Sequence, residues 1–240
     1  MDLSACRRKN SNNLIVLSVD KTRVRDLSPL AELSKLSIFS ANNTLVSDIS
    51  FLKKSNLQWL SLGNTKVTDI SALKNLKTLK YLNLTGCEVV EVNSIENNIS
   101  MKELILFGTK ISDIDSLKKL VNLGALTLSD TDVKDFSPIL KLVNLNSLKL
   151  YNTQFEDTKI LKNLSELKVL ELSFTKVKDL VPLMNLKNLE ELKLNGTNIT
   201  DFSPLKALKN LQELNLTKTS IPDDQYRELK EALPNCRIKK

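Results

Sequence analysis

The 240-residue chain contains no histidine and only three cysteines, so it has few of the side chains that bind transition metals or act as general bases. Cys6, Cys87 and Cys236 lie far apart and are odd in number, which argues against a disulfide framework and for reducing surroundings. The five glycines form no phosphate-binding loop. These absences predict no metal, no cofactor and no catalysis.

Long hydrophobic runs are missing too. No stretch reaches the roughly 18 apolar residues needed to cross a membrane. The first residues, MDLSACRRKNSNN, carry charges where a signal peptide would have an apolar core. We therefore expect a cytoplasmic protein without membrane contact or, alternatively, one secreted without a classical signal peptide.

The chain does contain one pattern that recurs from near its start to near its end. Each copy has apolar residues at its first, fourth and sixth positions, as at Leu189, Leu192 and Leu194. Copies begin 22 residues apart, with one interval of 21. The ten repeats begin at Leu14, Leu36, Leu57, Leu79, Met101, Leu123, Leu145, Leu167, Leu189 and Leu211.

Each repeat predicts one short strand, because its apolar residues alternate with polar ones. Few residues remain before the next strand, so we expect 3₁₀ or single-turn helices between strands. A single repeat cannot bury its own apolar side and must stack on its neighbours. The predicted fold class is α/β: a solenoid of about ten right-handed repeats, with a parallel concave sheet and short 3₁₀ or α turns on the convex side.

Two polar columns accompany the apolar ones. The ninth position holds Thr in nine repeats and Cys87 in the other, and a hydroxyl there can bond backbone groups of the adjacent turn. The thirteenth position holds Asp in nine repeats and Glu91 in the other. These carboxylates could form a metal column, but accepting N–H groups and capping the next helical turn explains each of them, and we adopt that interpretation.

Three regions follow from the pattern. Residues 1–13 form an N-terminal tail or minimal cap, and residues 14–221 form the repeats. Residues 222–240 form a capping helix and an edge strand, since Pro222 and Asp223 are typical of a helix start and Pro234 ends the apolar stripe of Tyr226, Leu229 and Leu233.

The span from Leu14 to Ile221 resembles the leucine-rich repeats of the bacterial internalins. The period and the phrase from Ile199 to Leu211 carry the resemblance. One departure is the ninth position, where internalin-type repeats usually carry Asn. The resemblance implies recognition of another protein on the concave face, and no catalysis.

The third, fifth and seventh residues of each repeat should point to the concave face, with the eighth just beyond. Large apolar and aromatic groups there predict a protein interface. The competing explanations are cross-strand packing that only stabilises the sheet and packing against an N-terminal segment folded over it. The predicted partner-binding residues are Ile38, Trp59, Tyr81, Glu103, Ile105, Phe107, Lys149, Tyr151, Glu171 and Phe174.

The overall charge of +7 could suggest nucleic-acid binding. However, many basic residues lie at the chain ends and on outer turns, and the concave positions carry a net charge of −2. We therefore expect a protein partner, no nucleic acid, and a monomer when free.

Two functions remain open. The chain is either an intracellular bacterial inhibitor or immunity-type protein that binds a protein partner, or a secreted or injected internalin-like effector or adhesin that binds a host protein.

Overall fold

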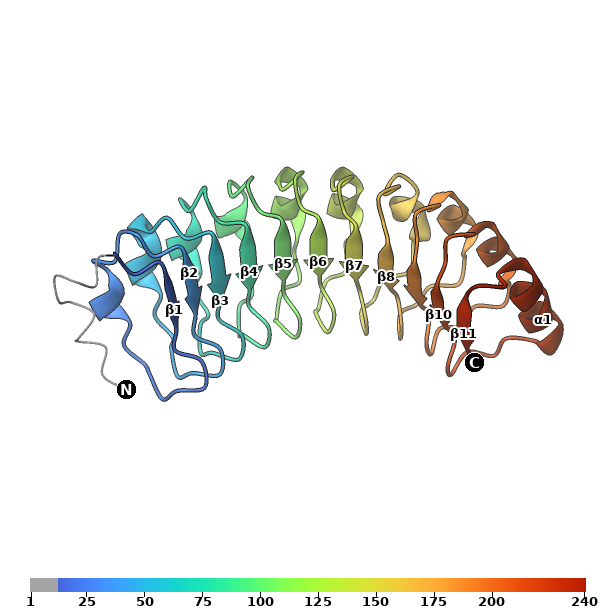
Figure 1. Ribbon diagram of the computed structural model, residues 1–240, viewed down its shortest axis with the longest axis horizontal. Helices are drawn as coiled ribbons and strands as arrows, with labels where there is room; N and C mark the ends of the chain where they lie inside the picture. Colours follow the sequence, from blue (N-terminus) through green and yellow to red (C-terminus); the bar gives the residue numbers. More distant parts are fainter. Residues whose placement is uncertain (1–12) are drawn as a thin grey trace. The chain divides into compact units, whose positions relative to one another are not determined.

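The computed structural model describes residues 13–240, and the chain divides into two compact units, 1–123 and 124–240. Each unit contains successive repeats whose strands pair in parallel and in chain order (Figure 1). In the first unit these strands are β1 (Val16–Ser18), β2 (Ile38–Ser40), β3 (Trp59–Ser61), β4 (Tyr81–Asn83) and β5 (Glu103–Ile105). In the second they are β6 (Ala125–Thr127), β7 (Ser147–Lys149), β8 (Val169–Glu171), β9 (Glu191–Lys193), β10 (Glu213–Asn215) and β11 (Arg237–Lys239).

Short 3₁₀ helices connect the strands, as the repeat length predicts, and the leucine-rich repeat fold is confirmed. The first unit contains η3 (Ser28–Leu30), η4 (Ser50–Lys54), η5 (Ser71–Leu73), η6 (Asn93–Ile95) and η7 (Asp115–Lys119). The second contains η8 (Ser137–Lys141), η9 (Thr158–Leu161), η10 (Val181–Asn185) and η11 (Ser203–Ala207). Between strands and helices lie the repeated leucines, almost all of which are buried.

The aspartate column bonds to the backbone at the start of these helices. In eight repeats the Asp side chain accepts a hydrogen bond from the backbone N–H two residues later, for example Asp135 from Ser137 at 2.8 Å. The expectation that these carboxylates accept N–H groups is confirmed for all eight, but only Asp157 is itself the N-cap of its helix, since in the other seven repeats the N-cap is the residue after the Asp. Those N–H groups would otherwise have no acceptor within so short a helix.

The threonine column differs from the prediction. Each of the nine threonines donates its hydroxyl proton to the carbonyl three residues earlier in its own repeat, as Thr109 does to Leu106 at 2.8 Å. The expectation of a bond to the adjacent turn was wrong for them. Only the Cys87 thiol reaches into the preceding repeat, where it donates to the carbonyl of Leu62 at 3.1 Å.

The physical reason lies one residue earlier, at the eighth position, which has a positive φ in all ten repeats. This left-handed residue turns the chain back on itself, so the threonine meets the carbonyl at the end of its own strand. The eighth positions are Lys21, Asn43, Asn64, Gly86, Gly108, Asp130, Asn152, Phe174, Gly196 and Lys218.

The chain ends with α1 (Asp223–Ala232) and then β11, which pairs in parallel with β10. Leu229 and Leu233 of this segment are buried. The predicted N-terminal tail or minimal cap, residues 1–13, lies almost wholly outside the described residues. In the first repeat Leu14 and Leu17 remain partly exposed, whereas the matching Leu36 and Phe39 of the second are buried.

Candidate functional site

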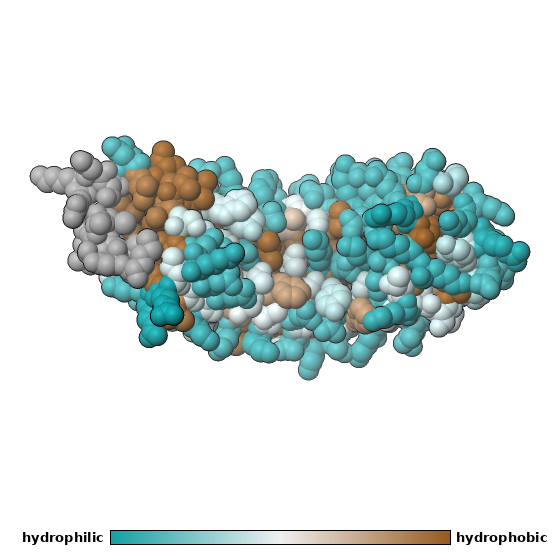
Figure 2. Space-filling model, turned by 60° about the horizontal axis from the view of Figure 1, so that its bottom comes forward, coloured by the Kyte–Doolittle hydropathy of each residue, from teal (hydrophilic) through white to brown (hydrophobic). Residues whose placement is uncertain are grey.

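The open sheet face is the side of each sheet that carries the third, fifth and seventh residues of the repeats. In the first unit its third-position row is apolar over four successive strands, because Val16, Ile38, Trp59 and Tyr81 are direct register neighbours. Val16, Ile38 and Trp59 are exposed and Tyr81 is half-buried. Hydrophobic side chains are concentrated at the end of this unit that holds the first repeats (Figure 2). We call these four residues the apolar row.

Within the apolar row the two aromatic side chains stack face to face. The ring centroids of Trp59 and Tyr81 are 3.4 Å apart and their planes differ by 4°. Strand spacing of about 4.8 Å brings the two residues together, since they occupy the same register position on neighbouring strands. Despite the stack, 41% of the Trp59 surface stays in solvent.

Polar side chains beside the apolar row form a hydrogen-bonded ladder. Asp20 accepts hydrogen bonds from the Ser40 hydroxyl and the Asn42 backbone, and Asn42 in turn accepts from Ser61 at 2.8 Å. Burial alone would raise the pKa of Asp20, but these hydrogen bonds outweigh it and hold that pKa below its ordinary value. The ladder fixes the fifth and seventh positions and leaves the apolar row uncovered.

The remaining predicted residues of the first unit lie on or just after β5. Glu103 follows Tyr81 in the register, and Ile105 follows Asn83. Glu103 and Ile105 are half-buried, and Phe107 is exposed. The structure thus places Trp59, Tyr81 and Glu103 on three consecutive strands.

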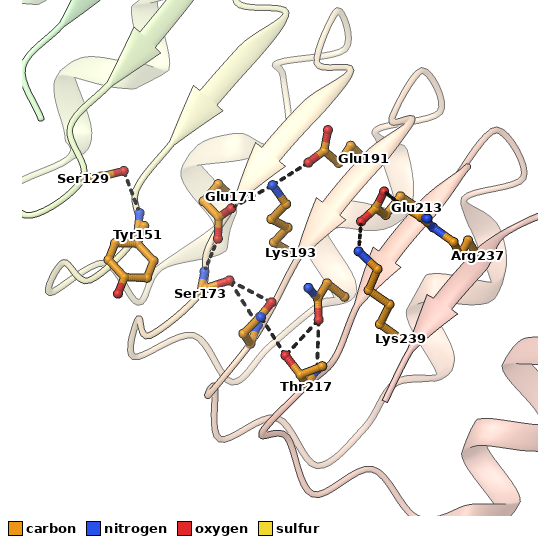
Figure 3. Close-up of polar contacts among 12 residues, drawn as sticks. Ser129, Tyr151, Glu171, Ser173, Glu191, Lys193, Glu213, Thr217, Arg237 and Lys239 are labelled. Carbon is orange, nitrogen blue, oxygen red and sulfur yellow. Dashed lines mark hydrogen bonds and ion pairs between the residues drawn. The ribbon is translucent and has the colours of Figure 1, made fainter.

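The open sheet face of the second unit is charged instead. Lys193 bonds to Glu191 at 2.7 Å and lies 3.5 Å from Glu171, and Glu213 binds Arg237 and Lys239 at 2.6 and 2.7 Å (Figure 3). Hydrogen bonding to Glu191 is the main reason that the pKa of Lys193 is raised. Hydrogen bonds from Lys239 and Arg237 lower the pKa of Glu213 to about 2.

These ion pairs change the interpretation of two predicted residues. Lys149 and Glu171 are register neighbours, but Glu171 pairs with Lys193 and its carboxylate also accepts the backbone N–H of Ser173. Lys193 was missing from the predicted site. The opposite charges at successive strands would have indicated this pairing in the sequence.

Tyr151 and Phe174 form a separate aromatic pair in the second unit. Their rings meet edge to face at 5.5 Å, and the ammonium of Lys218 lies 5.5 Å from the centre of the Phe174 ring. Phe174 is 40% exposed and holds φ at 56°, a left-handed conformation that a bulky residue rarely adopts. Its ring occupies the space where Gly196 has no side chain. Sequence reasoning missed both Gly196 and Lys218.

The titratable residues show no arrangement typical of a metal centre. Among residues 13–240, no three or more Cys, Asp or Glu side chains come together as a metal site would require. Burial raises the pKa of the Cys87 and Cys236 thiols, which leaves both less reactive. Within the same range, no helix is both long and apolar enough to span a membrane.

Comparisons with known proteins agree with this geometry. The profile described as "Leucine Rich repeats (2 copies)" matches residues 55–97, 165–207 and 187–230. The chain is 29% identical to an internalin (inlF) from Listeria monocytogenes, with a TM-score of 0.91 over 98% of this chain and 72% of that one. It is 30% identical to internalin C2 (inlC2) of the same organism, with a TM-score of 0.69 over 89% and 83% of the two chains.

A more distant structure shares the fold alone. It is the plant peptide hormone receptor RGFR1 in complex with RGF2, which is 16% identical, with a TM-score of 0.71 over 95% of this chain and 44% of that one. A comparison with curated protein sequences gives no match.

Proposed function

The chain belongs to the internalin-like leucine-rich repeat proteins of bacteria, and we propose that it is a non-catalytic module that binds a protein partner through its open sheet face. The apolar row carries this proposal. Large apolar groups on the solvent side of a sheet do not contribute to the core, and exposed aromatic residues are the usual anchors of protein interfaces.

The competing explanation is that the apolar row only stabilises its own sheet. Stacking accounts for the contact between Trp59 and Tyr81, but Val16 and Ile38 extend the row without any aromatic pairing and remain exposed. A partner that covers this row would remove their apolar surface from water. The second aromatic pair, Tyr151 and Phe174, gives the other unit a contact point of its own.

We further propose that the protein acts inside a bacterial cell as an inhibitor or immunity-type protein. The thiols of Cys87 and Cys236 are free, which fits reducing surroundings. Recovery of a toxin with the tagged chain from its native cell would support this role. Recovery of the chain from culture supernatant would favour the secreted or injected alternative.

The surface itself is tested with the captured partner. Trp59→Ala combined with Tyr81→Ala should weaken binding about 30-fold or more, because losing buried aromatic anchors typically costs about 2 kcal/mol. Lys74→Ala combined with Lys118→Ala, which changes two exposed residues on the outer turns, is the control and should leave affinity nearly unchanged. If the lysine pair abolishes binding and the aromatic pair spares it, the partner binds the opposite side.

A further inference from the structure

Among residues 13–123, one carboxylate on the open sheet face makes no ion pair with a basic side chain. Glu103 and Asp20 are the acidic residues there, and Asp20 is satisfied by Ser40 and Asn42. In the part of the chain that the structure describes, the Glu103 carboxylate makes neither an ion pair nor a hydrogen bond. It is half-buried, so water only partly compensates its charge.

The glutamates on the open sheet face of the second unit are paired with basic side chains. Glu171 and Glu213 pair with a lysine or arginine of a neighbouring strand, and Glu191 pairs with Lys193 of its own strand (Figure 3). That face neutralises its own carboxylates and offers a partner little net charge. Glu103 differs because its neighbour on β4 is an aromatic residue.

Tyr81 is the register neighbour of Glu103 on the adjacent strand. Trp59 covers one face of the ring from the β3 side, so the other face is turned towards β5, where Glu103 stands. Burial first, and then the negative charge of Glu103, raise the pKa of Tyr81, which agrees with a carboxylate close to the ring. An aromatic face next to a carboxylate is a suitable environment for a planar cation.

We propose that Tyr81 and Glu103 accept an arginine side chain of the protein partner. The guanidinium lies flat against the free face of Tyr81 and donates hydrogen bonds to the Glu103 carboxylate. Apolar side chains of the same partner segment cover Ile38 and Trp59. This inference rests on the proposed function and adds the chemistry of the partner: a basic residue flanked by apolar ones.

Peptide selection tests the inference on the full chain by itself. A random dodecapeptide library displayed on phage is selected against that chain, and enriched peptides are then synthesised with arginine or with citrulline, its neutral isostere. We expect arginine beside apolar residues. The citrulline exchange should lower affinity for the unaltered chain at least about tenfold, the loss expected for a charge-assisted contact.

Two variants locate the contact. Against Glu103→Gln the arginine and citrulline peptides should differ less than about twofold, since the carboxylate that distinguishes them is gone. Glu191→Gln, which removes a carboxylate already paired with Lys193, should keep the full difference. The emission of Trp59, the only tryptophan in the chain, reports binding directly.

The outcomes separate the two proposals. Peptides that lose affinity for Trp59→Ala but respond equally to citrulline in the unaltered chain and in Glu103→Gln would overturn the arginine site and leave the proposed function standing. A selection without any binder that depends on Trp59 would overturn both.

Discussion

Replacing Gly196 with alanine should lower the free energy of unfolding by about 2 kcal/mol, roughly twice the loss from the same change at Gly108. Both glycines have a positive φ, 61° and 67°, which costs a residue with a Cβ about 1 kcal/mol. At Gly196 the new Cβ would also stand 2.6 Å from Cε1 of Phe174, so the ring must move off Tyr151. Aromatic pairs of this kind contribute about 0.5–1.5 kcal/mol.

Gly108 is the matched control, because a Cβ there would meet nothing closer than backbone atoms of Gly86 at 3.9 Å. Urea denaturation followed by circular dichroism gives the two losses. Phe174→Asn alone and together with Gly196→Ala completes a cycle, in which the coupling should be about 1 kcal/mol. Equal losses at both glycines, or a cycle without coupling, would refute the placement of the Phe174 ring over Gly196.

Three further predictions concern Cys87 in the threonine column, the loss of stability at acidic pH and the C-terminal segment. Cys87→Thr should change stability by less than about 1 kcal/mol and Cys87→Asp should cost more than about 3 kcal/mol by burying an unpaired charge; native Cys87 alkylated as fast as a free thiol would contradict this burial. Hydrogen bonds from Lys239 and Arg237 lower the pKa of Glu213 to about 2. The ionised side chain therefore contributes fully to the free energy of unfolding above pH 4.5, and this contribution is lost as the pH falls towards 2. Glu213→Gln should therefore reduce the change in unfolding free energy between pH 4.5 and pH 2. An unchanged pH dependence in that range would disprove the pairing. Deleting residues 223–240 should cause aggregation or loss of cooperative melting, whereas a monomeric, cooperative truncated chain would show that this segment is no cap.

The sequence was sufficient for the fold because its information is periodic. Spacing of Leu189, Leu192 and Leu194 predicts a strand with its buried side defined, and ten copies leave no other way to bury that side than stacking. The helix type followed from the length of the segment between strands, and the bond that Asp135 accepts from Ser137 followed from its place before a helical turn.

The direction of the threonine bonds could have been predicted and was not. Asn43, Asn64, Gly86 and Asn152 at the eighth position are residues that tolerate a left-handed backbone, and they indicate that the chain folds back there. With that turn in place, the hydroxyl of the ninth residue comes within bonding distance of the carbonyl three residues earlier. Phe174 hides the signal in its repeat, because a bulky residue rarely adopts this conformation.

The candidate site was predictable as a set of positions but not as a set of contacts. Pleat alternation places Trp59, Tyr81 and Glu103 on one side of the sheet. Whether two rings stack, and which carboxylate finds a cation, depends on rotamers and on the reach of long side chains across strands. For that reason the sequence could suggest a contact of Lys193 with Glu171, but only the structure shows that Lys193 bonds to Glu191 as well.

The nine ninth-position threonines and eight of the thirteenth-position aspartates bond within their own repeats, so these two columns of contacts do not depend on which repeat stands next to them. Unequal crossing-over between two similar repeats can therefore remove or add a whole copy of the unit in the gene and still leave every internal bond intact. Lineages of such proteins can vary the length of their sheet in whole steps, while point mutation on the open face changes what the sheet recognises.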